Sequence, residues 1–167
     1  MILAIDVYYH KDTTARVIGV GFDWDDHIPK QVYKETVHQV AAYIPGQFYK
    51  RELPCILSLL DHIPVDQVTC IIVDGHVFID NNKTFGLGGH LWKSLKEEIP
   101  IIGVAKRSFH DTAQVSIPVL RGTSTNPLYV SSIGIAIEEA VKNIQHMHGQ
   151  YRIPTILKTL DQLTRKQ

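Results

Sequence analysis

Apolar runs separated by short polar segments occupy the first forty residues of the chain. Residues 2–9 and 15–22 have the β-branched and aromatic content of strands, and a third strand is expected around 31–40. The segments between them, 10–14 and 23–26, have the polar composition of turns. Parallel neighbours need a crossover of a dozen or more residues, so these short connections predict an antiparallel meander.

Beyond residue 44 the pattern changes to helices that alternate with buried strands. An Ile-Pro-Gly sequence at 44–46 ends the third strand, and apolar residues then recur at helical spacing. Nearly continuous apolar runs further along the chain are typical of strands buried on both faces. The expected elements are helices over 48–63, 87–98, 133–148 and 153–164, and strands over 67–74, 101–104 and 127–131.

This order of elements predicts the fold class. Three antiparallel strands followed by alternating helices and strands give an α/β fold, a mixed sheet flanked by helices. The order resembles the ribonuclease H-like architecture, in which the first strand and the strand at 67–74 are parallel neighbours.

Composition narrows the class of protein. The 167 residues, 18.9 kDa in mass, suit one domain over 1–167. Cys55 and Cys70 cannot form a disulfide framework, which favours a cytoplasmic protein, and no apolar run reaches the ~18 residues of a membrane helix. Seventeen basic residues balance seventeen acidic ones, which argues against an obligate polybasic nucleic-acid binder but allows a local basic groove.

Two acidic residues interrupt the apolar pattern of the strands. Asp6 lies inside the first strand, where an unpaired carboxylate is costly to bury, and Asp74 ends the strand over 67–74. Ligands of open α/β sheets bind at the carboxyl ends of the central strands, so both acids face one pocket if their strands are parallel neighbours. Glu52, where the 43–46 segment passes into a helix, is a third candidate. For each acid the competing interpretation is a solvated cap or turn residue.

A cluster of these three carboxylates would repel itself. Two unit charges ~4 Å apart cost about 4 kcal/mol at an effective dielectric constant near 20. Such a cluster either takes up a proton or binds a divalent cation. Oxygen ligands select hard ions, which predicts Mg²⁺, with Mn²⁺ as a substitute, and hard ions on carboxylates activate water in phosphodiester cleavage.

Sequence blocks around these acids occur in a specific order and spacing. They are Ile5-Asp6-Val7, Tyr43-Ile44-Pro45-Gly46 with Arg51-Glu52-Leu53-Pro54, Val73-Asp74-Gly75-His76, and Pro100-Ile101-Ile102-Gly103-Val104-Ala105-Lys106. Together they resemble the endonuclease V family of metal-dependent nucleases, which act beside deaminated bases such as inosine. The chain is similar to a shortened and divergent member of that family.

The resemblance implies roles for individual residues. Asp6, Glu52 and Asp74 would hold Mg²⁺ as catalytic ligands, and Lys106 would contact a phosphate near the cleaved bond. Residues Tyr43, Ile44 and Pro45 resemble the wedge that enters the base stack when the modified base turns outward, and Gly75 and His76 would line the base pocket. The implied partner is DNA or RNA, cleaved 3′ to the deaminated base to leave 3′-hydroxyl and 5′-phosphate ends.

Departures from the family pattern keep other functions open. An active-site histidine of the family, expected next to the metal, aligns at or next to Ile133, and Val77 replaces a glycine of the family. We therefore expect weaker catalysis and a base pocket narrowed by the valine. One alternative is therefore an endonuclease V-fold protein that binds nucleic acid or a protein partner without cleavage. Another is a metal phosphoesterase acting on a junction or flap.

Several remaining features favour ordinary structural roles. The acidic turn with Asp23, Asp25 and Asp26 is expected to be solvated, and the glycines at 86–89 are expected to allow close packing at the start of a helix. Surface positions are expected for His110, His146 and His148, and packing roles for Trp24 and Trp92.

Overall fold

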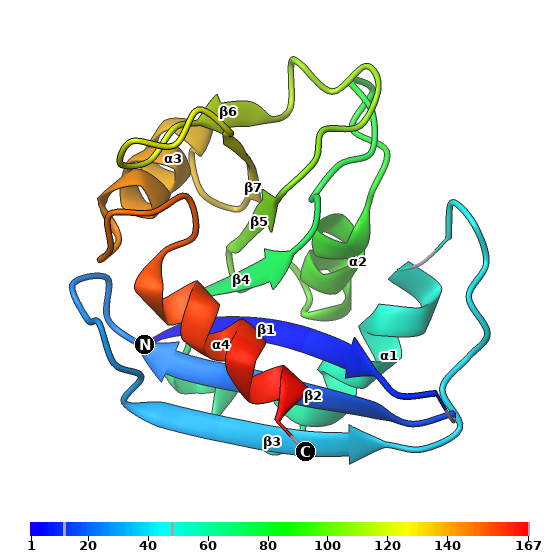
Figure 1. The fold of residues 1–167 in the computed structure, drawn as a ribbon. Helices are drawn as coiled ribbons and strands as arrows, with labels where there is room; N and C mark the ends of the chain where they lie inside the picture. The colour runs from blue at the N-terminus through cyan, green and yellow to red at the C-terminus, as the bar shows by residue number, and fades with distance from the viewer. Residues whose placement is uncertain (12, 48, 167) are drawn as a thin grey trace.

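A seven-stranded mixed sheet forms the centre of the computed structural model, which describes residues 1–11, 13–47 and 49–166 (Figure 1). The strands are β1 (Ile2–Tyr9), β2 (Ala15–Phe22), β3 (Gln31–Val37), β4 (Cys70–Asp74), β5 (Ile101–Ala105), β6 (Ile117–Val119) and β7 (Leu128–Ile133). The helices are α1 (Tyr49–Leu60), α2 (Leu87–Ser94), α3 (Ile137–His146) and α4 (Thr155–Arg165), with a 3₁₀ turn η1 (Val65–Gln67).

The order of strands across the sheet is β3-β2-β1-β4-β5-β7-β6. The first three strands form the expected antiparallel meander, and β1, β4 and β5 run parallel in the middle of the sheet. Strand β7 is antiparallel to β5, and β6 pairs with its outer edge. The predicted α/β mixed sheet, with β1 and β4 as parallel neighbours, is therefore confirmed.

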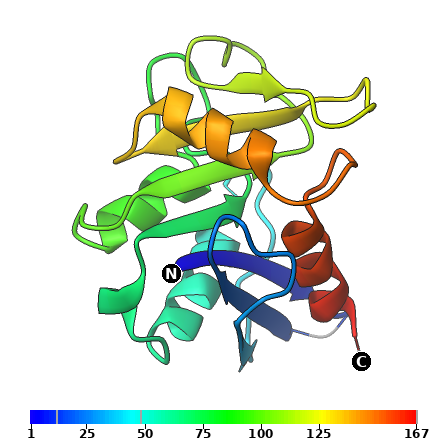
Figure 2. The ribbon, with the colours of Figure 1, turned by 90° about the vertical axis from the view of Figure 1, so that its left-hand side faces the viewer.

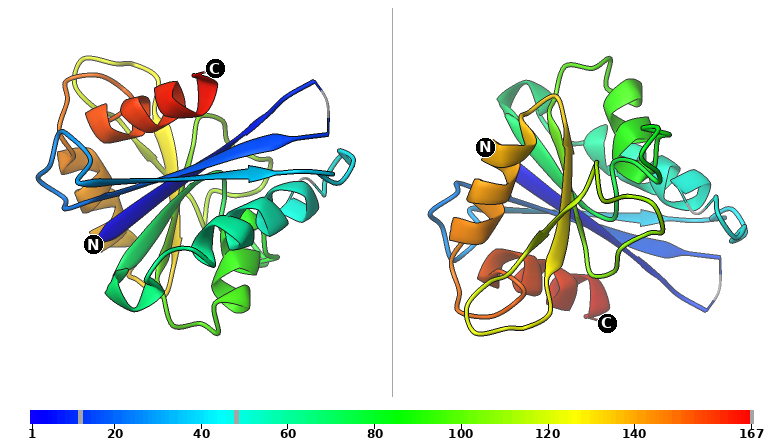
Figure 3. Two further views of the ribbon diagram at one scale, coloured as in Figure 1. Left: turned by 90° about the horizontal axis from the view of Figure 1, so that it is seen from below. Right: turned by 90° about the horizontal axis from the view of Figure 1, so that it is seen from above.

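Helices cover both faces of this sheet, as Figure 3 shows from two sides. Helices α1 and α2 pack on one face against Leu3, Ile5 and Ile71, whereas α3 and α4 pack on the other against Ala4 and Ile72. Figure 2 shows α3 along the strands at the β7 edge and α4 beside β1. Successive side chains of a strand point to opposite faces, so Asp6 and Asp74 share the face of α4.

Element boundaries differ from the predicted ones where pairing or packing decides them. The strand predicted over 127–131 extends to Ile133 because it pairs with β5 along its length, and the following helix begins only at Ile137. The third strand ends at Val37, and β4 begins at Cys70. Strand β6 was not predicted, because three residues containing a proline carry little strand signal.

Two close approaches explain glycines near the edge of the sheet. A Cβ on Gly103 would lie 2.6 Å from the carbonyl oxygen of Gly75, so glycine in β5 lets the chain after β4 cross directly over it. A Cβ on Gly88 would lie 2.8 Å from a methyl group of Val77, which confirms a packing role for the glycines at the start of α2. Within the described residues, none of the helices is long and apolar enough to cross a membrane.

Candidate functional site

A pocket of about 160 Å³ lies at the carboxyl ends of β1, β4 and β5, beneath α4. Its position follows from the parallel strands, because their carboxyl ends meet at one edge of the sheet. The charged residues that line it are Asp6, Asp74, Lys106, Lys158 and Asp161, and the apolar ones include Ala4, Ile72, Val104, Leu128, Ile153 and Leu157. The pocket therefore combines an apolar floor with charged groups from three strand ends and one helix.

Asp6 is a strand carboxylate held by two hydrogen bonds. Its Oδ1 accepts from the backbone N–H of Val7 at 2.9 Å, and its Oδ2 accepts from the hydroxyl of Thr164 at 3.4 Å. Burial and the charge of Asp74 raise the pKa of Asp6 to about 6, although both hydrogen bonds act in the opposite direction. The carboxylate form of Asp6 is therefore disfavoured in the absence of a compensating positive charge.

Asp74 lies next to Asp6 across the parallel pair. The register pairs Ile5 with Val73, so the next residue on each strand is one of the two acids. Asp74 is exposed at the rim of the pocket, yet the surrounding protein desolvates it enough to raise its pKa. Attraction to Lys106 offsets part of this rise, which agrees with the place of Lys106 in the lining of the same pocket.

Glu52 reaches the same group of acids from the opposite face of the sheet. It lies in the first turn of α1 and is not part of the pocket lining. Burial, followed by the charges of Asp74 and Asp6, raises the pKa of Glu52 to about 8, and Arg51 offsets only part of this effect. The three acids named from the sequence are thus brought close enough to disfavour one another's ionised forms.

Asp161 is a fourth acid that the sequence analysis missed. It lines the pocket from α4, and its charge contributes to the raised pKa values of Asp6 and Asp74. Its Oδ1 also accepts a hydrogen bond from Nε of Arg165 at 3.1 Å. Lys158 and Asp161 are three residues apart and share one face of the helix, a signal that is visible in the sequence but identical to that of any solvated helix face.

The donor set fits a hard divalent cation in its chemistry. Asp6, Asp74 and Asp161 line the pocket, and Glu52 interacts electrostatically with two of them from the opposite face of the sheet. The pKa values of Asp6, Glu52 and Asp74 are raised, and a bound cation would lower them. In the part of the chain that the structure describes, no three His, Cys, Asp or Glu side chains already converge on one point as metal ligands. Binding of a cation would therefore draw these side chains together.

His76 is placed inside the protein rather than on an open surface. Its side chain is 4% exposed, its Nε2 hydrogen-bonds with the carbonyl oxygen of Arg107 at 2.8 Å, and its ring lies 4.4 Å from that of Phe109. His76 thereby fixes the loop that follows Lys106. Its Nδ1 is buried without a partner in the described structure, so one ring atom is left for a ligand.

The predicted wedge lies on an exposed loop beside a second hollow. Tyr43 and Ile44 are 59% and 48% exposed, and the turn continues through Gly46 at a φ of +78°. The hollow next to this loop has a volume of about 530 Å³. It is lined by Gly46, Gln47, Tyr49, Ile79, Lys83, Thr84, Phe85 and His90. Tyr49 and His90 are stacked there with ring centroids 3.9 Å apart.

Ile133 and Val77, the two departures from the family pattern, do not lie where they were predicted to act. Ile133 pairs with Ile101 at the amino end of β5, whereas the pocket is at the carboxyl end, so the prediction that position 133 adjoins the metal was wrong. Val77 is fully buried, and its backbone N–H donates to the hydroxyl of Ser131 at 3.0 Å. Its side chain packs in the core against α2, so the prediction that it narrows a base pocket was also wrong.

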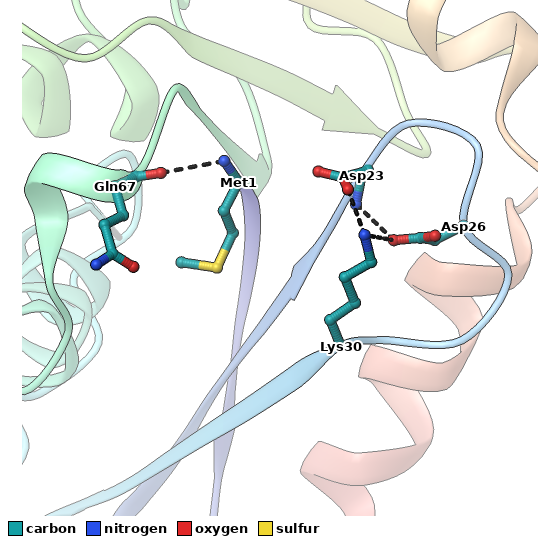
Figure 4. A network of polar contacts seen from close by, with 5 residues as sticks. All are labelled: Met1, Asp23, Asp26, Lys30 and Gln67. Atoms are coloured by element: carbon teal, nitrogen blue, oxygen red, sulfur yellow. Dashed lines mark hydrogen bonds and ion pairs between the residues drawn. The ribbon is translucent and has the colours of Figure 1, made fainter.

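The ordinary roles predicted for other residues are confirmed. Lys30 forms ion pairs with Asp23 and Asp26 in the acidic turn, and Figure 4 shows them together with the separate hydrogen bond from the amine of Met1 to the carbonyl oxygen of Gln67. His110, His146 and His148 are exposed, and Trp24 and Trp92 pack against the two apolar clusters. Cys55 and Cys70 are buried free thiols.

Comparison with known proteins identifies relatives over most of the chain. The model of the endonuclease V family matches residues 1–120. An endonuclease V of Thermus thermophilus is 26% identical over 181 residues, an alignment that covers 94% of this chain and 77% of that protein.

Solved structures of the same family share the fold. The catalytic domain of human endonuclease V has a TM-score of 0.78 at 21% identity, covering 98% of this chain and 80% of that one. Endonuclease V of Ciona intestinalis, in complex with a 24mer DNA containing an inosine followed by a ribo-adenosine, has a TM-score of 0.80 at 17% identity, covering 98% and 83%. These likenesses confirm the ribonuclease H-like fold.

Proposed function

Since the chain belongs to the endonuclease V family, a family of metal-dependent nucleases, we propose that it hydrolyses the phosphodiester 3′ to a deaminated base, inosine, in DNA or RNA. The observation that carries this proposal is the group of mutually repelling acids beside Lys106 at the carboxyl ends of β1, β4 and β5. The family match identifies the class of enzyme, and the geometry of this edge supports the assignment of roles to residues.

Asp6 and Asp74 are proposed as the nearest ligands of Mg²⁺, for which Mn²⁺ would substitute. Glu52 and Asp161 would approach from α1 and α4 on the two faces of the sheet. When bound, the ion supplies an activated water and stabilises charge on the leaving oxygen. The acids themselves hold the ion at the strand ends, and the apolar floor of the pocket limits the water around it.

Lys106 is proposed to bind the phosphate that is cleaved. It follows β5 directly and shares the pocket with Asp74. A fixed positive charge there stabilises negative charge that develops on the phosphoryl oxygens in the transition state. The contact of His76 with the carbonyl oxygen of Arg107 holds the loop after Lys106, so His76 is proposed as a positioning residue as well as part of the base pocket.

Recognition of the deaminated base is proposed at the exposed loop and the hollow beside it. Tyr43, Ile44 and Pro45 would fill the space that the base leaves, which offsets part of the unstacking cost of a few kcal/mol per step. The adjacent hollow is large enough for a planar base and is lined by aromatic rings and backbone. Gly75 directly follows Asp74 and has a φ of +149°, which favours glycine.

Binding without cleavage is the alternative function, and the positions of Ile133 and Val77 do not favour it over cleavage. Ile133 is at the other end of β5, and Val77 is in the core. All four acids and Lys106 are present at the site, which favours catalysis over binding alone.

The direct test is cleavage of labelled oligonucleotides by the purified chain. Inosine-containing DNA and RNA, matched undamaged strands, and junction and flap substrates should each be incubated with Mg²⁺, Mn²⁺ or EDTA. We expect cleavage on the 3′ side of inosine that requires the metal and leaves 3′-hydroxyl ends. Asp74→Asn, which keeps the shape of the side chain and removes one charge, should reduce cleavage at least about 10³-fold.

A matched control removes an acid far from the site. Asp25 is exposed in the turn after β2, and Asp25→Asn should cleave as the unmodified chain does. Preference for branched substrates over inosine would favour the phosphoesterase alternative. Absence of cleavage on every substrate, with a folded protein and bound metal, would contradict the proposed function.

A further inference from the structure

A buried arginine holds the loop over 147–154, which joins α3 to α4. The side chain of Arg121 is 3% exposed and has backbone carbonyls of this loop as its hydrogen-bond partners. Its Nη1 donates to the carbonyl oxygen of Tyr151 at 2.6 Å, and its Nη2 donates to that of Gly149 at 3.3 Å. A buried guanidinium needs such partners, so the loop and the arginine order one another.

A second arginine connects the same loop to the catalytic edge. Nη2 of Arg152 donates to the carbonyl oxygen of Lys106 at 2.6 Å and to that of Pro127 at 2.7 Å. Ile153, the next residue, lines the pocket together with Lys106 and Asp161. The loop is therefore part of the rim of the pocket, on the side where Lys106 is proposed to bind the phosphate.

Tyr151 projects from this fixed loop into solvent. Its side chain is 77% exposed, more than that of Tyr43 at 59%. Its backbone is held by Arg121, and within the described residues its ring has no hydrogen bond or aromatic contact. A large aromatic ring on an ordered backbone can contact a flat ligand with little loss of conformational entropy.

Basic side chains lie on the segments next to this loop. Lys106 and Arg107 are exposed on the strand end to which Arg152 is bonded, and Lys158 is exposed on the first turns of α4. Exposed aromatic rings among basic side chains are the combination that binds single strands, because bases stack on the rings and phosphates contact the charges. A local basic rim of this kind is compatible with a net charge of zero over the chain.

We propose that Tyr151 stacks on a nucleobase of the substrate strand next to the phosphate bound by Lys106, with Arg121 and Arg152 holding the loop in place for this contact. This inference deepens the proposed function and rests on it. It assigns the α3–α4 loop to the strand that is cleaved, and the exposed loop over 43–45 to the space that the turned-out base leaves in the stack. Stacking is tolerant of sequence, so Tyr151 would add affinity without choosing among bases.

A thermodynamic cycle between protein and nucleic acid tests this contact. Binding to a fluorescein-labelled inosine strand is measured by anisotropy in Mg²⁺, in an Asp74→Asn background so that the strand stays whole. Tyr151→Ala, Tyr151→Phe and Ile28→Ala are each added, since Ile28 is 66% exposed in the turn at the other end of the sheet. The strand is then prepared with an abasic nucleotide at successive positions on either side of the inosine.

We expect Tyr151→Ala to weaken binding about 5- to 100-fold, the range for loss of one stacked base. Tyr151→Phe should bind within about twofold of the parent, because stacking needs the ring and not the hydroxyl. Ile28→Ala should have no effect. At one abasic position the loss caused by Tyr151→Ala should disappear, and that position identifies the stacked nucleotide.

The inference would be overturned if Tyr151→Ala bound as tightly as its parent, or if no abasic position removed the loss. It would also be overturned if the parent bound no strand. Cleavage by the unmodified chain is measured separately. Cleavage without any effect of Tyr151 leaves the proposed function in place and removes this inference. If binding depends on Tyr151 in this cycle but the unmodified chain cleaves no substrate, the stacking contact stands and the proposed function is contradicted.

Discussion

The two ends of the sheet hold similar acidic residues in opposite electrostatic situations. At the end near the N-terminus, Asp23 and Asp26 are paired with Lys30 in a turn open to solvent, and the pairing lowers the pKa of Asp23 (Figure 4). At the other end, Asp6 and Glu52 have pKa values raised to about 6 and about 8. The sequence places acids at both ends, but only one end supplies enough positive charge for them.

The two ends of the sheet differ in how the charge of their acidic residues is balanced. A turn can recruit a lysine from a few residues away, and solvent screens what remains. The acids of the site come from β1, α1, β4 and α4, and burial and mutual repulsion together outweigh the attraction of Lys106 and Arg51. Folding these groups together costs free energy that an added cation would recover, which is the physical reason to expect a metal there.

After Asp74→Asn, the largest effect is expected from removing Asp161, the fourth acid of the site. Asp161→Asn should reduce cleavage of an inosine strand about 10²-fold or more, because it removes a carboxylate that faces Asp6 and Asp74 across the pocket. Initial rates over a range of Mg²⁺ concentrations measure this effect. Arg165→Met is the matched control, because it removes the ion pair of Asp161 and keeps the carboxylate. A similar loss in both variants would mean that the ion pair, not the carboxylate, is what matters.

A smaller effect concerns the dependence of stability on pH. The folded state holds the proton of Glu52 more tightly than the unfolded chain, since the pKa is raised from 4.5 to about 8. The free energy of unfolding should therefore fall as pH rises from about 4.5 to about 8, and Glu52→Gln should remove this loss. In EDTA, urea unfolding should show the variant about 2–4 kcal/mol more stable at pH 9 and equal to the unmodified chain at pH 4.

Added Mg²⁺ provides the control for this pH effect. The ion binds the folded state of the unmodified chain and should narrow the difference at pH 9. A Glu52→Gln variant that is no more stable at pH 9 would show that Glu52 is not electrostatically strained.

The smallest effect is expected at the opposite end of the sheet. Lys30→Met removes the partner of Asp23 and Asp26, all of which are accessible to solvent. Exposed pairs contribute little, so the melting temperature should change by no more than about 2 °C, and the difference should vanish in high salt. A large loss of stability that persists in high salt would remove the contrast between the two ends.

Local patterns were sufficient to predict the sheet and most of its elements. The apolar runs of β1, β2, β4 and β5 predict the strands. Short turns predict antiparallel neighbours and long crossovers predict parallel ones, which together give the mixed sheet. The parallel pairing of β1 with β4 then predicts that Asp6 and Asp74 lie together. Strand β6 could not be predicted in this way, because it depends on a partner strand and not on its own three residues.

The rest of the site depends on long-range packing that a sequence pattern does not contain. Asp161 is one of several polar residues on an amphipathic helix, and only the packing of α4 on β1 and β2 brings it to the pocket. Ile133 was assigned to the site from a resemblance, yet the antiparallel pairing of β7 with β5 places it at the amino end of β5. Nothing in the local sequence distinguishes Arg121 from an exposed charged residue, and its burial is seen only in the structure.

The location of a bound Mn²⁺ ion would show whether Asp6 and Asp74 hold a metal. A crystal grown with manganese and measured at the metal's absorption edge gives an anomalous peak at the ion. We expect a peak within ligand distance, about 2.0–2.4 Å, of oxygens from Asp6 and Asp74, with Glu52 or Asp161 turned toward it. A peak elsewhere, or no peak while these carboxyl groups pair neutrally with one another, would contradict it.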